Sequence, residues 1–485
     1  MDTLRDMRRL RRRVRIGAPD PWLTPVSGMA AVTELVHQLG MIKLLDAAIG
    51  AVKTRDRGVS GGQLLVGLAG AQLAGEDFLV GLDRQRADVA AQVLAPVTGL
   101  SSTTAAGLAR RFTDGQWRAV ETGIGDIHTA MLAALPPARA AALCDEVTID
   151  LDTTDVEVYG RKKRGVAFNY QGQRCGRPHV ATWAQTATAL AADLMAGDED
   201  PRSHAPELLR RALGALPAAA RSGRIRLRAD AGYFAGQLAR AAHMADAEFA
   251  IGAKRIAPLW RLLADLAETQ WTDALDMDGA QVAVTSYCPD WWPTATQLLI
   301  RRVRLDIDAG QVSHDPRARR RRTLHPDQRA LPLAELAELD AVYGYSFIVT
   351  NLDVSTPEQT AAVEHWYRHR TQIENIFRDA KIGAALRHLP SGYPQVNTAW
   401  MGGALLAVNI AGWLHHLTAT PGPGNTLLGH GVREGQAMIA TLRHKLIRVP
   451  ARLVRHAGAF DLRLPPGHHL LDKVLARLRA LPATS

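Results

Sequence analysis

The spacing of apolar residues changes near residue 146, and this change limits the possible folds more than any other feature of the sequence. Before it, apolar residues recur every three or four positions, as in AVTELVHQLGMIKLLDAAIG, which is typical of helices that bury one face. After it, EVTIDLDTTDVEVYG alternates and is rich in β-branched residues, which predicts a strand. Further strands then alternate with helices, so we expect an α/β core behind a helical N-terminal region.

The same pattern divides the chain into successive regions. Strands and helices alternate at first, antiparallel strands follow, and a strand and a long helix then return. Ser355 and Glu358 are predicted to cap the start of that helix as a capping box. The expected regions are a basic arm (1–17), a helical region (18–140), the first part of the α/β core (141–254), a β-rich insertion (255–344), the second part of the core (345–395) and a helical, basic C-terminal region (396–485).

The charge of the chain favours a polyanionic partner. Its 485 residues carry 58 Lys and Arg against 48 Asp and Glu, a net charge of +10. Residues 1–17 are rich in arginine, which fits either a solvated tail or an arm that follows phosphates. No CxxC or CxxH spacing exists, so a zinc site is not expected. The N-terminus lacks the apolar segment of a signal peptide, and the longest apolar run, WMGGALLAVNIAGWL, is too short to span a bilayer, so we expect a cytoplasmic protein.

Short helices separated by glycine turns make up the region before residue 140. Ser60 and Gln63 are predicted to form a capping box at the start of one helix. Another helix, in SSTTAAGLARRF, begins at a serine cap and ends with Arg110 and Arg111. This arrangement suits a helix-turn-helix-like reader of DNA, and it suits a plain helical bundle equally well.

Three acidic residues stand where a metal site would need them. Asp152 lies near the end of the first core strand, Asp230 ends a later strand, and Glu374 lies in the long helix. In α/β sheets, sites form beyond the carboxyl ends of the strands. Three carboxylates from three elements can hold two magnesium ions and leave room for phosphate. The alternative for each aspartate is a helix cap or a turn residue.

The helix around Glu374 carries positive charge on the same face. Tyr367, Arg370, Glu374 and Lys381 are spaced so that a regular helix would place them on one stripe. A glutamate could then bind metal while the arginine and the lysine hold the phosphates on which the metal acts, and Tyr367 is a further candidate for holding and orienting them. The sequence therefore predicts a site for phosphate chemistry.

The spacing Y-x2-R-x3-E-x6-K of these four residues resembles the signature of a large group of bacterial insertion-sequence transposases of the DDE class. DLDTTD and LRADAGYF resemble the motifs that carry the first and second catalytic aspartates of that group. SSTTAAGLARRF and TLRHKLIRVPARLVRH resemble elements of the insertion-sequence family thirteen-eighty. The resemblance covers residues from about 95 to 460. Asp150 lies on the same strand face as Asp152, but Asp152 is the residue that matches the motif.

This resemblance implies an RNase H-like catalytic core interrupted by a β-rich insertion, with two Mg²⁺ or Mn²⁺ ions held by Asp152, Asp230 and Glu374. It implies metal-activated water that cuts DNA at terminal inverted repeats, and a freed 3′-OH that attacks target DNA. A homodimer would hold the DNA ends together in the bacterial nucleoid. In related transposases a tryptophan of the insertion stacks on a flipped base, so Trp291 and Trp292 are candidates, with turn packing as their alternative.

Further basic residues are candidates for DNA contacts. They are Arg110 and Arg111, an arginine cluster, and the basic C-terminal stretch. The cluster consists of Arg317 and Arg319–Arg322, and Arg319 and Arg320 are its main candidates. For the cluster, the alternative is a solvated loop. Two other functions stay open from the sequence alone: a nuclease on the same fold that cuts without joining, and a transposase-derived DNA-binding protein without catalysis.

Overall fold

A computed structural model describes residues 16–55, 57–305, 342–421, 427–429, 432–433 and 436–482. Its N-terminal part is helical, as the period of the sequence predicts, and the predicted cap at Ser60 is confirmed, with Gln63 as its capping-box partner. Ser101 likewise caps the helix that precedes Arg110. The helices of this part are α2 (Met29–Gln38), α3 (Met41–Ile49), α4 (Gly61–Ala74), α5 (Gly81–Ala87), α6 (Val89–Leu94), α7 (Ser102–Ala109), α8 (Asp114–Ala134) and α9 (Pro137–Asp145).

A mixed sheet of eleven strands follows and confirms the predicted α/β class. Its order is β3-β5-β2-β7-β8-β12-β11-β10-β9, and β4 and β6 also pair with β5. Strand β5 lies antiparallel to β2 and β6, whereas β7 lies parallel to both β2 and β8. The strands are β2 (Glu146–Thr153), β3 (Val156–Glu157), β4 (Ala167–Phe168), β5 (Arg174–Trp183), β6 (Thr188–Ala196), β7 (Arg224–Ala229), β8 (Glu248–Ala253), β9 (Thr272–Asp273), β10 (Ala280–Ser286), β11 (Gln297–Leu305) and β12 (Val342–Thr350).

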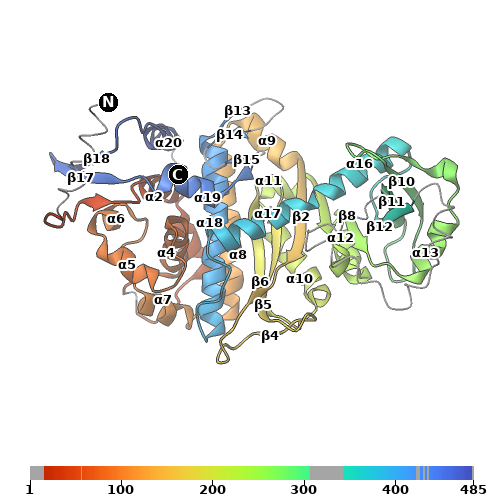
Figure 1. Ribbon diagram of the computed structural model, residues 1–485, viewed down its shortest axis with the longest axis horizontal. Helices are drawn as coiled ribbons and strands as arrows, with labels where there is room; N and C mark the ends of the chain where they lie inside the picture. Colours follow the sequence, from red (N-terminus) through yellow and green to blue (C-terminus); the bar gives the residue numbers. More distant parts are fainter. Residues whose placement is uncertain are drawn as a thin grey trace, which may run out of the picture.

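The antiparallel strands predicted between residues 255 and 344 extend this same sheet. Strand β12 pairs with β8, and β11, β10 and β9 continue outward from it. Figure 1 shows these strands and α13 (Ala257–Ala264) at one end of the molecule and the N-terminal helices at the other. The helices that connect the central strands are α10 (Pro201–Gly214), α11 (Ala218–Arg221) and α12 (Gly236–Met244).

The long helix predicted after β12 is not continuous. It consists of α16 (Pro357–Arg368), a 3₁₀ turn (His369–Thr371), α17 (Gln372–Arg378) and a π-helical turn (Asp379–Gly383). Its predicted capping box is wrong by one position, because Thr356 rather than Ser355 accepts from the backbone N–H of the third helical residue, Gln359. The cap residue therefore lies next to Pro357, at the first helical position.

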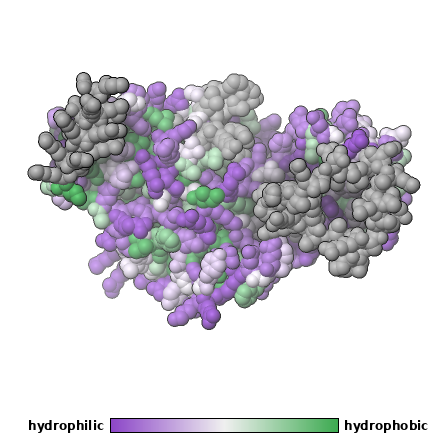
Figure 2. Space-filling view, in the orientation of Figure 1, coloured by the Kyte–Doolittle hydropathy of each residue, from purple (hydrophilic) through white to green (hydrophobic). Residues whose placement is uncertain are grey.

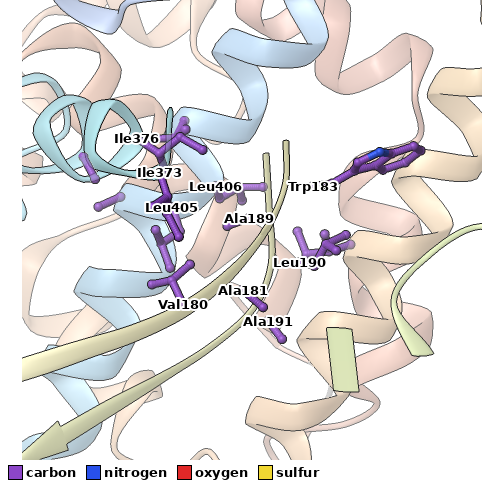
Figure 3. Packing of buried hydrophobic residues seen from close by; sticks show 14 of the residues in the cluster. Val180, Ala181, Trp183, Ala189, Leu190, Ala191, Ile373, Ile376, Leu405 and Leu406 are labelled. Carbon is purple, nitrogen blue, oxygen red and sulfur yellow. The ribbon is translucent and has the colours of Figure 1, made fainter. Parts of the chain in front are cut away.

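A buried helix fixes the long helix to the sheet. Helix α18 (Pro394–Thr418) contains the longest apolar run of the sequence and is buried along most of its length. Figure 3 shows Leu405 and Leu406 of α18 beside Val180 of β5 and close to Ile373 and Ile376 of α17. None of the described helices has the length and apolar character needed to cross a membrane. The hydrophobic core thus runs from the sheet through α18 to the underside of α17.

The C-terminal region contains helices, as predicted, and also strands that the sequence did not indicate. After α18 come short strands, the one-turn helix α19 (Ile439–Leu442), a π-helical turn (Arg443–Ile447) and a β-hairpin of β17 (Ala451–His456) and β18 (Ala459–Arg463) before α20 (Leu470–Arg479). In β17, Ala451 and Leu453 are buried while Arg452 between them is exposed. This alternation is that of a half-buried strand, and the arginines and histidines in it obscured the period.

Candidate active site

The ends of two neighbouring parallel strands bring the two predicted aspartates together. In the register of β2 and β7, Leu151 lies opposite Ala229, and the next residues along the two strands are Asp152 and Asp230. Both carboxylates therefore leave the sheet at the same edge, beyond the carboxyl ends of adjacent strands. Asp230 also accepts a hydrogen bond from Gly232 N (2.8 Å), which fixes the turn that follows β7.

The surroundings of Asp152 disfavour its ionised form. Burial and the negative charge of Asp230 raise the pKa of Asp152 to about 7, and the charge of Glu374 acts in the same direction. The opposing contributions come from Arg370, whose Nη1 lies 3.1 Å from Asp152 Oδ2, and from the hydrogen bond that Thr153 N donates (2.7 Å). The charges of Asp230 and Glu374 thus both act on Asp152, and one arginine lies beside it.

Tyr367 attaches the end of α16 to the strand that carries Asp230. Its hydroxyl donates to the carbonyl of Ala229, the last residue of β7, over 3.1 Å. Burial raises the pKa of Tyr367 to about 12, so the phenol keeps its proton and acts as a donor. Glycine is required at position 252, because a Cβ there would lie 2.6 Å from the Tyr367 hydroxyl and 2.8 Å from Ala231 N. The hydroxyl of the signature tyrosine thus binds the end of β7, and its predicted phosphate contact stays a prediction.

Glu374 points away from the core on α17. Ile373, Ile376 and Phe377 of the same helix are buried, whereas Glu374 is exposed. Figure 3 shows the buried isoleucines facing α18 and the sheet. The core therefore holds α17 by one side and leaves the carboxylate on the other side, where its charge reaches Asp152.

Lys381 does not extend the stripe of a regular helix. It lies in the π-helical turn after α17, and its ammonium donates to the carbonyl of Asp155 over 2.8 Å. Burial lowers the pKa of Lys381. Asp155 follows β2 and is itself paired with Arg177 of β5 (2.7 Å). The lysine of the signature thus reaches the segment just after Asp152 through a tertiary contact that helical spacing does not describe.

Asp150 serves the fold. It is fully buried and forms a bidentate pair with Arg228 of β7, at 2.7 and 2.8 Å. Arg228 also donates to the carbonyl of Trp366 in α16 (2.7 Å). This pair links β2, β7 and α16, and it leaves Asp152 as the aspartate of the strand nearer to Glu374 and Arg370. The buried position of Arg228 could not be predicted, because the alternation of RIRLRA places it on the same strand face as the exposed Arg224.

The carboxylates of the candidate site suit a hard divalent cation in chemical type, although they do not converge on one point. Among the described residues, no three His, Cys, Asp or Glu side chains are arranged so that they could hold a metal ion as they stand. Asp152 and Asp230 nevertheless supply carboxylate oxygens, which Mg²⁺ and Mn²⁺ prefer. Burial and, after it, repulsion from Asp230 raise the pKa of Asp152, and a divalent cation would relieve that repulsion.

The two candidate tryptophans differ in exposure. Trp292 is buried and packs against Phe234, Phe249 and Tyr287, so its ring is core. Trp291 is 61% exposed, and its carbonyl accepts from Arg240 of α12, the helix that follows the Asp230 turn. Of the pair, only Trp291 presents a ring to solvent.

The remaining basic candidates fall into different settings. Arg110 and Arg111 are exposed at the end of α7. Arg319 and Arg320, with the rest of their cluster, lie outside the described residues, as does most of the basic arm. In the C-terminal stretch, Arg443 donates to the carbonyls of Leu73, Gln72 and Gly383, so its guanidinium holds the fold together.

One comparison with known proteins shows a family. The family model described as "Transposase DDE domain group 1" matches residues 9–312 and 327–483. No curated protein matches the chain. Among solved structures, a piggyBac transposase synaptic complex with hairpin DNA has 11% sequence identity and a TM-score of 0.36, with 78% of this chain and 74% of the other covered. The family match spans most of the sequence, and the chain belongs to the DDE transposase domain group 1 family.

Proposed function

We propose that this protein is a transposase that cuts DNA at the inverted repeats of a mobile element and joins the ends to target DNA. The single observation that carries the proposal is the placement of Asp152 and Asp230 at adjacent parallel strand ends, with the charge of Glu374 felt at Asp152. Membership of the DDE family supports the same chemistry. The finer assignment to the insertion-sequence family thirteen-eighty, with its four-residue signature, is part of the proposal.

The strand order supports an RNase H-like core. Three antiparallel strands, β6, β5 and β2, lie next to two strands parallel to β2, namely β7 and β8, which is the arrangement expected of that core. The predicted region boundaries, 141–254 and 345–395 for the core and 255–344 for the insertion, belong to this proposal. The proposal also includes a homodimer that holds two DNA ends together. It further assigns DNA recognition to the helical N-terminal region, with Arg110 and Arg111 among the contacting residues.

In the proposed mechanism, Asp152, Asp230 and Glu374 would hold two Mg²⁺ or Mn²⁺ ions. When bound, these ions would activate a nucleophile and stabilise the leaving oxygen of an in-line displacement. Arg370 supplies positive charge beside Asp152, where a phosphate would add negative charge. Tyr367 and the Asp150–Arg228 pair hold the helix and the strands in place. Lys381 orients the segment after Asp152 and is the second candidate for a phosphate contact.

The test uses purified protein, labelled element ends, a target plasmid and Mg²⁺. Strand-transfer products support a transposase, cleavage alone supports a nuclease, and retarded but uncut DNA supports a binding protein. Glu374→Gln should keep DNA binding and lose cleavage by a factor of about 100 or more, since it removes a metal ligand. Glu358→Gln is the matched control, because Glu358 is exposed in the first turn of α16. Normal cleavage by Glu374→Gln would contradict the site assignment.

A further inference from the structure

A run of basic residues follows the Asp152 strand and the short strand β3. The sequence GRKKRG connects β3 to β4, and Arg161, Lys162 and Arg164 in it are exposed. Lys163 turns inward instead, and its ammonium donates to the carbonyl of Leu389. We call residues 158–173, from the end of β3 to the start of β5, the basic hairpin.

The basic hairpin is held in a defined shape by hydrogen bonds. Arg174 of β5 donates to the carbonyls of Gly160 (2.7 Å) and Lys163 (2.6 Å). Arg164 N donates to the carbonyl of Gly392, just before α18, over 3.2 Å. Figure 1 shows β4 at the same end of the sheet as the end of α18 near α7. The exposed side chains of the hairpin therefore project from a fixed backbone.

Two arginines from different regions meet at one tyrosine beside the hairpin. The guanidinium carbons of Arg110, at the end of α7, and Arg164 lie 4.9 and 5.0 Å from the centre of the Tyr393 ring. Neither guanidinium has a carboxylate partner in the part of the chain that is described, and the ring itself is 43% exposed. Two guanidinium groups beside a partly exposed ring would suit an anion that also presents a flat surface.

Aromatic rings on the hairpin are left in solvent. Tyr159, Phe168 and Tyr170 are 85%, 64% and 89% exposed, and Phe168 is opposite Arg174 in the β4–β5 pairing. Figure 2 shows that the visible face of the molecule is mainly hydrophilic, with hydrophobic residues in smaller patches. Exposed rings on an ordered hairpin mark a binding surface rather than core packing.

The hairpin is tied to the candidate active site. Asn169 Nδ2 donates to Asp155 Oδ2 over 2.8 Å, and the carbonyl of Asp155 accepts from Lys381. Asp155 comes three residues after Asp152, a distance of about 10 Å along an extended chain. A nucleic acid strand lying on the hairpin would therefore lead toward the Asp152 strand end.

We propose that the basic hairpin, with Arg110 and Tyr393, binds a DNA strand whose bases are unpaired next to the cleavage site. Its arginines and lysine would contact phosphates, and its rings would stack on bases. Paired bases in a duplex already stack on their neighbours, so exposed rings favour DNA that is opened or single-stranded. This inference rests on the proposed function and adds the strand conformation that the protein selects.

Binding is measured in EDTA, so that catalysis plays no part, with a short oligonucleotide that carries 2-aminopurine, alone and annealed to its complement. The double variant Phe168→Ala, Tyr170→Ala should bind the single strand about fivefold more weakly or worse, quench 2-aminopurine less, and bind the duplex as before. Arg161→Ala, Lys162→Ala should weaken both and reduce the slope of log affinity against log salt by about 1.4 for the single strand. The controls are Phe460→Ala, an exposed ring on β18, and Arg221→Ala at the end of α11.

The outcomes separate this inference from the proposed function. If the ring variant binds the single strand like the unmodified protein, or if Phe460→Ala loses as much affinity, the basic hairpin is not the binding surface. The proposed transposase function is then still tested separately by cleavage in Mg²⁺. Equal affinity of the unmodified protein for single strand and duplex would also overturn the inference. Absence of binding to either DNA would contradict the proposed function as well. Tyr170→Ser alone, at a position where the residue is 89% exposed, repeats the test if the double variant is unstable.

Discussion

At the scale of single residues, two aspartates on one strand face have different roles. Asp150 and Asp152 are separated by one residue, and the sequence predicted that both would point the same way. Asp150 is neutralised in the interior by Arg228, whereas Asp152 lies nearer the strand end with Arg370, Asp230 and the charge of Glu374. The motif alone favoured Asp152, and it could not reveal the buried pair, because Arg228 belongs to a strand much further along the chain.

The buried pair makes a stability prediction. Arg228→Met leaves the Asp150 carboxylate buried without its partner and should destabilise the fold by about 3–5 kcal/mol. Combining it with Asp150→Leu removes both charges and should recover much of that loss. Urea unfolding followed by circular dichroism measures both variants. If the double variant is no more stable than Arg228→Met, the uncompensated charge is not the cause.

Among the helices and strands, the helix that carries Glu374 has interruptions that its local sequence does not predict. No Pro or Gly interrupts residues 358–382, so the sequence predicted a continuous helix. The 3₁₀ and π-helical turns coincide with tertiary contacts instead. Asp379 accepts from Ile439 N (2.9 Å), and Arg443 donates to Gly383 O while also binding two carbonyls at the end of α4. These partners come from distant parts of the chain, and spacing within the helix cannot indicate them.

Arg443 should therefore hold the π-helical turn in place. Arg443→Met removes the donors to Leu73, Gln72 and Gly383, and it should destabilise the protein by about 1–3 kcal/mol, because buried carbonyls lose their partners. Hydrogen exchange should speed up first in residues 379–383. Arg455→Met, an exposed arginine of β17, is the matched control. Unchanged exchange in that turn would show that Arg443 does not position it.

In the molecule as a whole, one sheet and α18 connect regions that were predicted from the sequence as separate. The predicted antiparallel strands continue the central sheet through the β8–β12 pairing, and β17 pairs with the two-residue strand β1 (Leu23–Thr24). Alternation predicted most of these strands, but it does not determine their partners. The alternating pattern of β17 was hidden by its charged residues, so the C-terminal hairpin was missed.

Glu121 of α8 links the helical region to the sheet and makes stability depend on pH. It pairs with Arg211 of α10 (3.1 Å) and accepts from Ala192 N of β6 (3.2 Å), and burial raises its pKa to about 7. Because the raised pKa belongs to the folded state, its contribution to stability is complete below about pH 4.5 and is lost as the pH rises through 7, a change of roughly 3 kcal/mol.

Glu121→Gln should therefore gain stability relative to the unmodified protein between pH 5 and 8, as followed by urea unfolding at each pH. Glu207→Gln in α10 is the control, since Glu207 is far more exposed and pairs with Arg210 on the surface. If the free energy of unfolding of Glu121→Gln and of the unmodified protein changed in parallel with pH, the Glu121 carboxyl would not have the raised pKa in the folded state.

The most direct test of the shared carboxylate site is a crystal structure grown with Mn²⁺ and measured at the manganese absorption edge. Anomalous density between Asp152, Asp230 and Glu374 is the expected result, and it should disappear in Asp152→Asn. Manganese bound elsewhere, or density that excludes any one of the three carboxylates, would contradict the assignment of this strand edge as the catalytic centre.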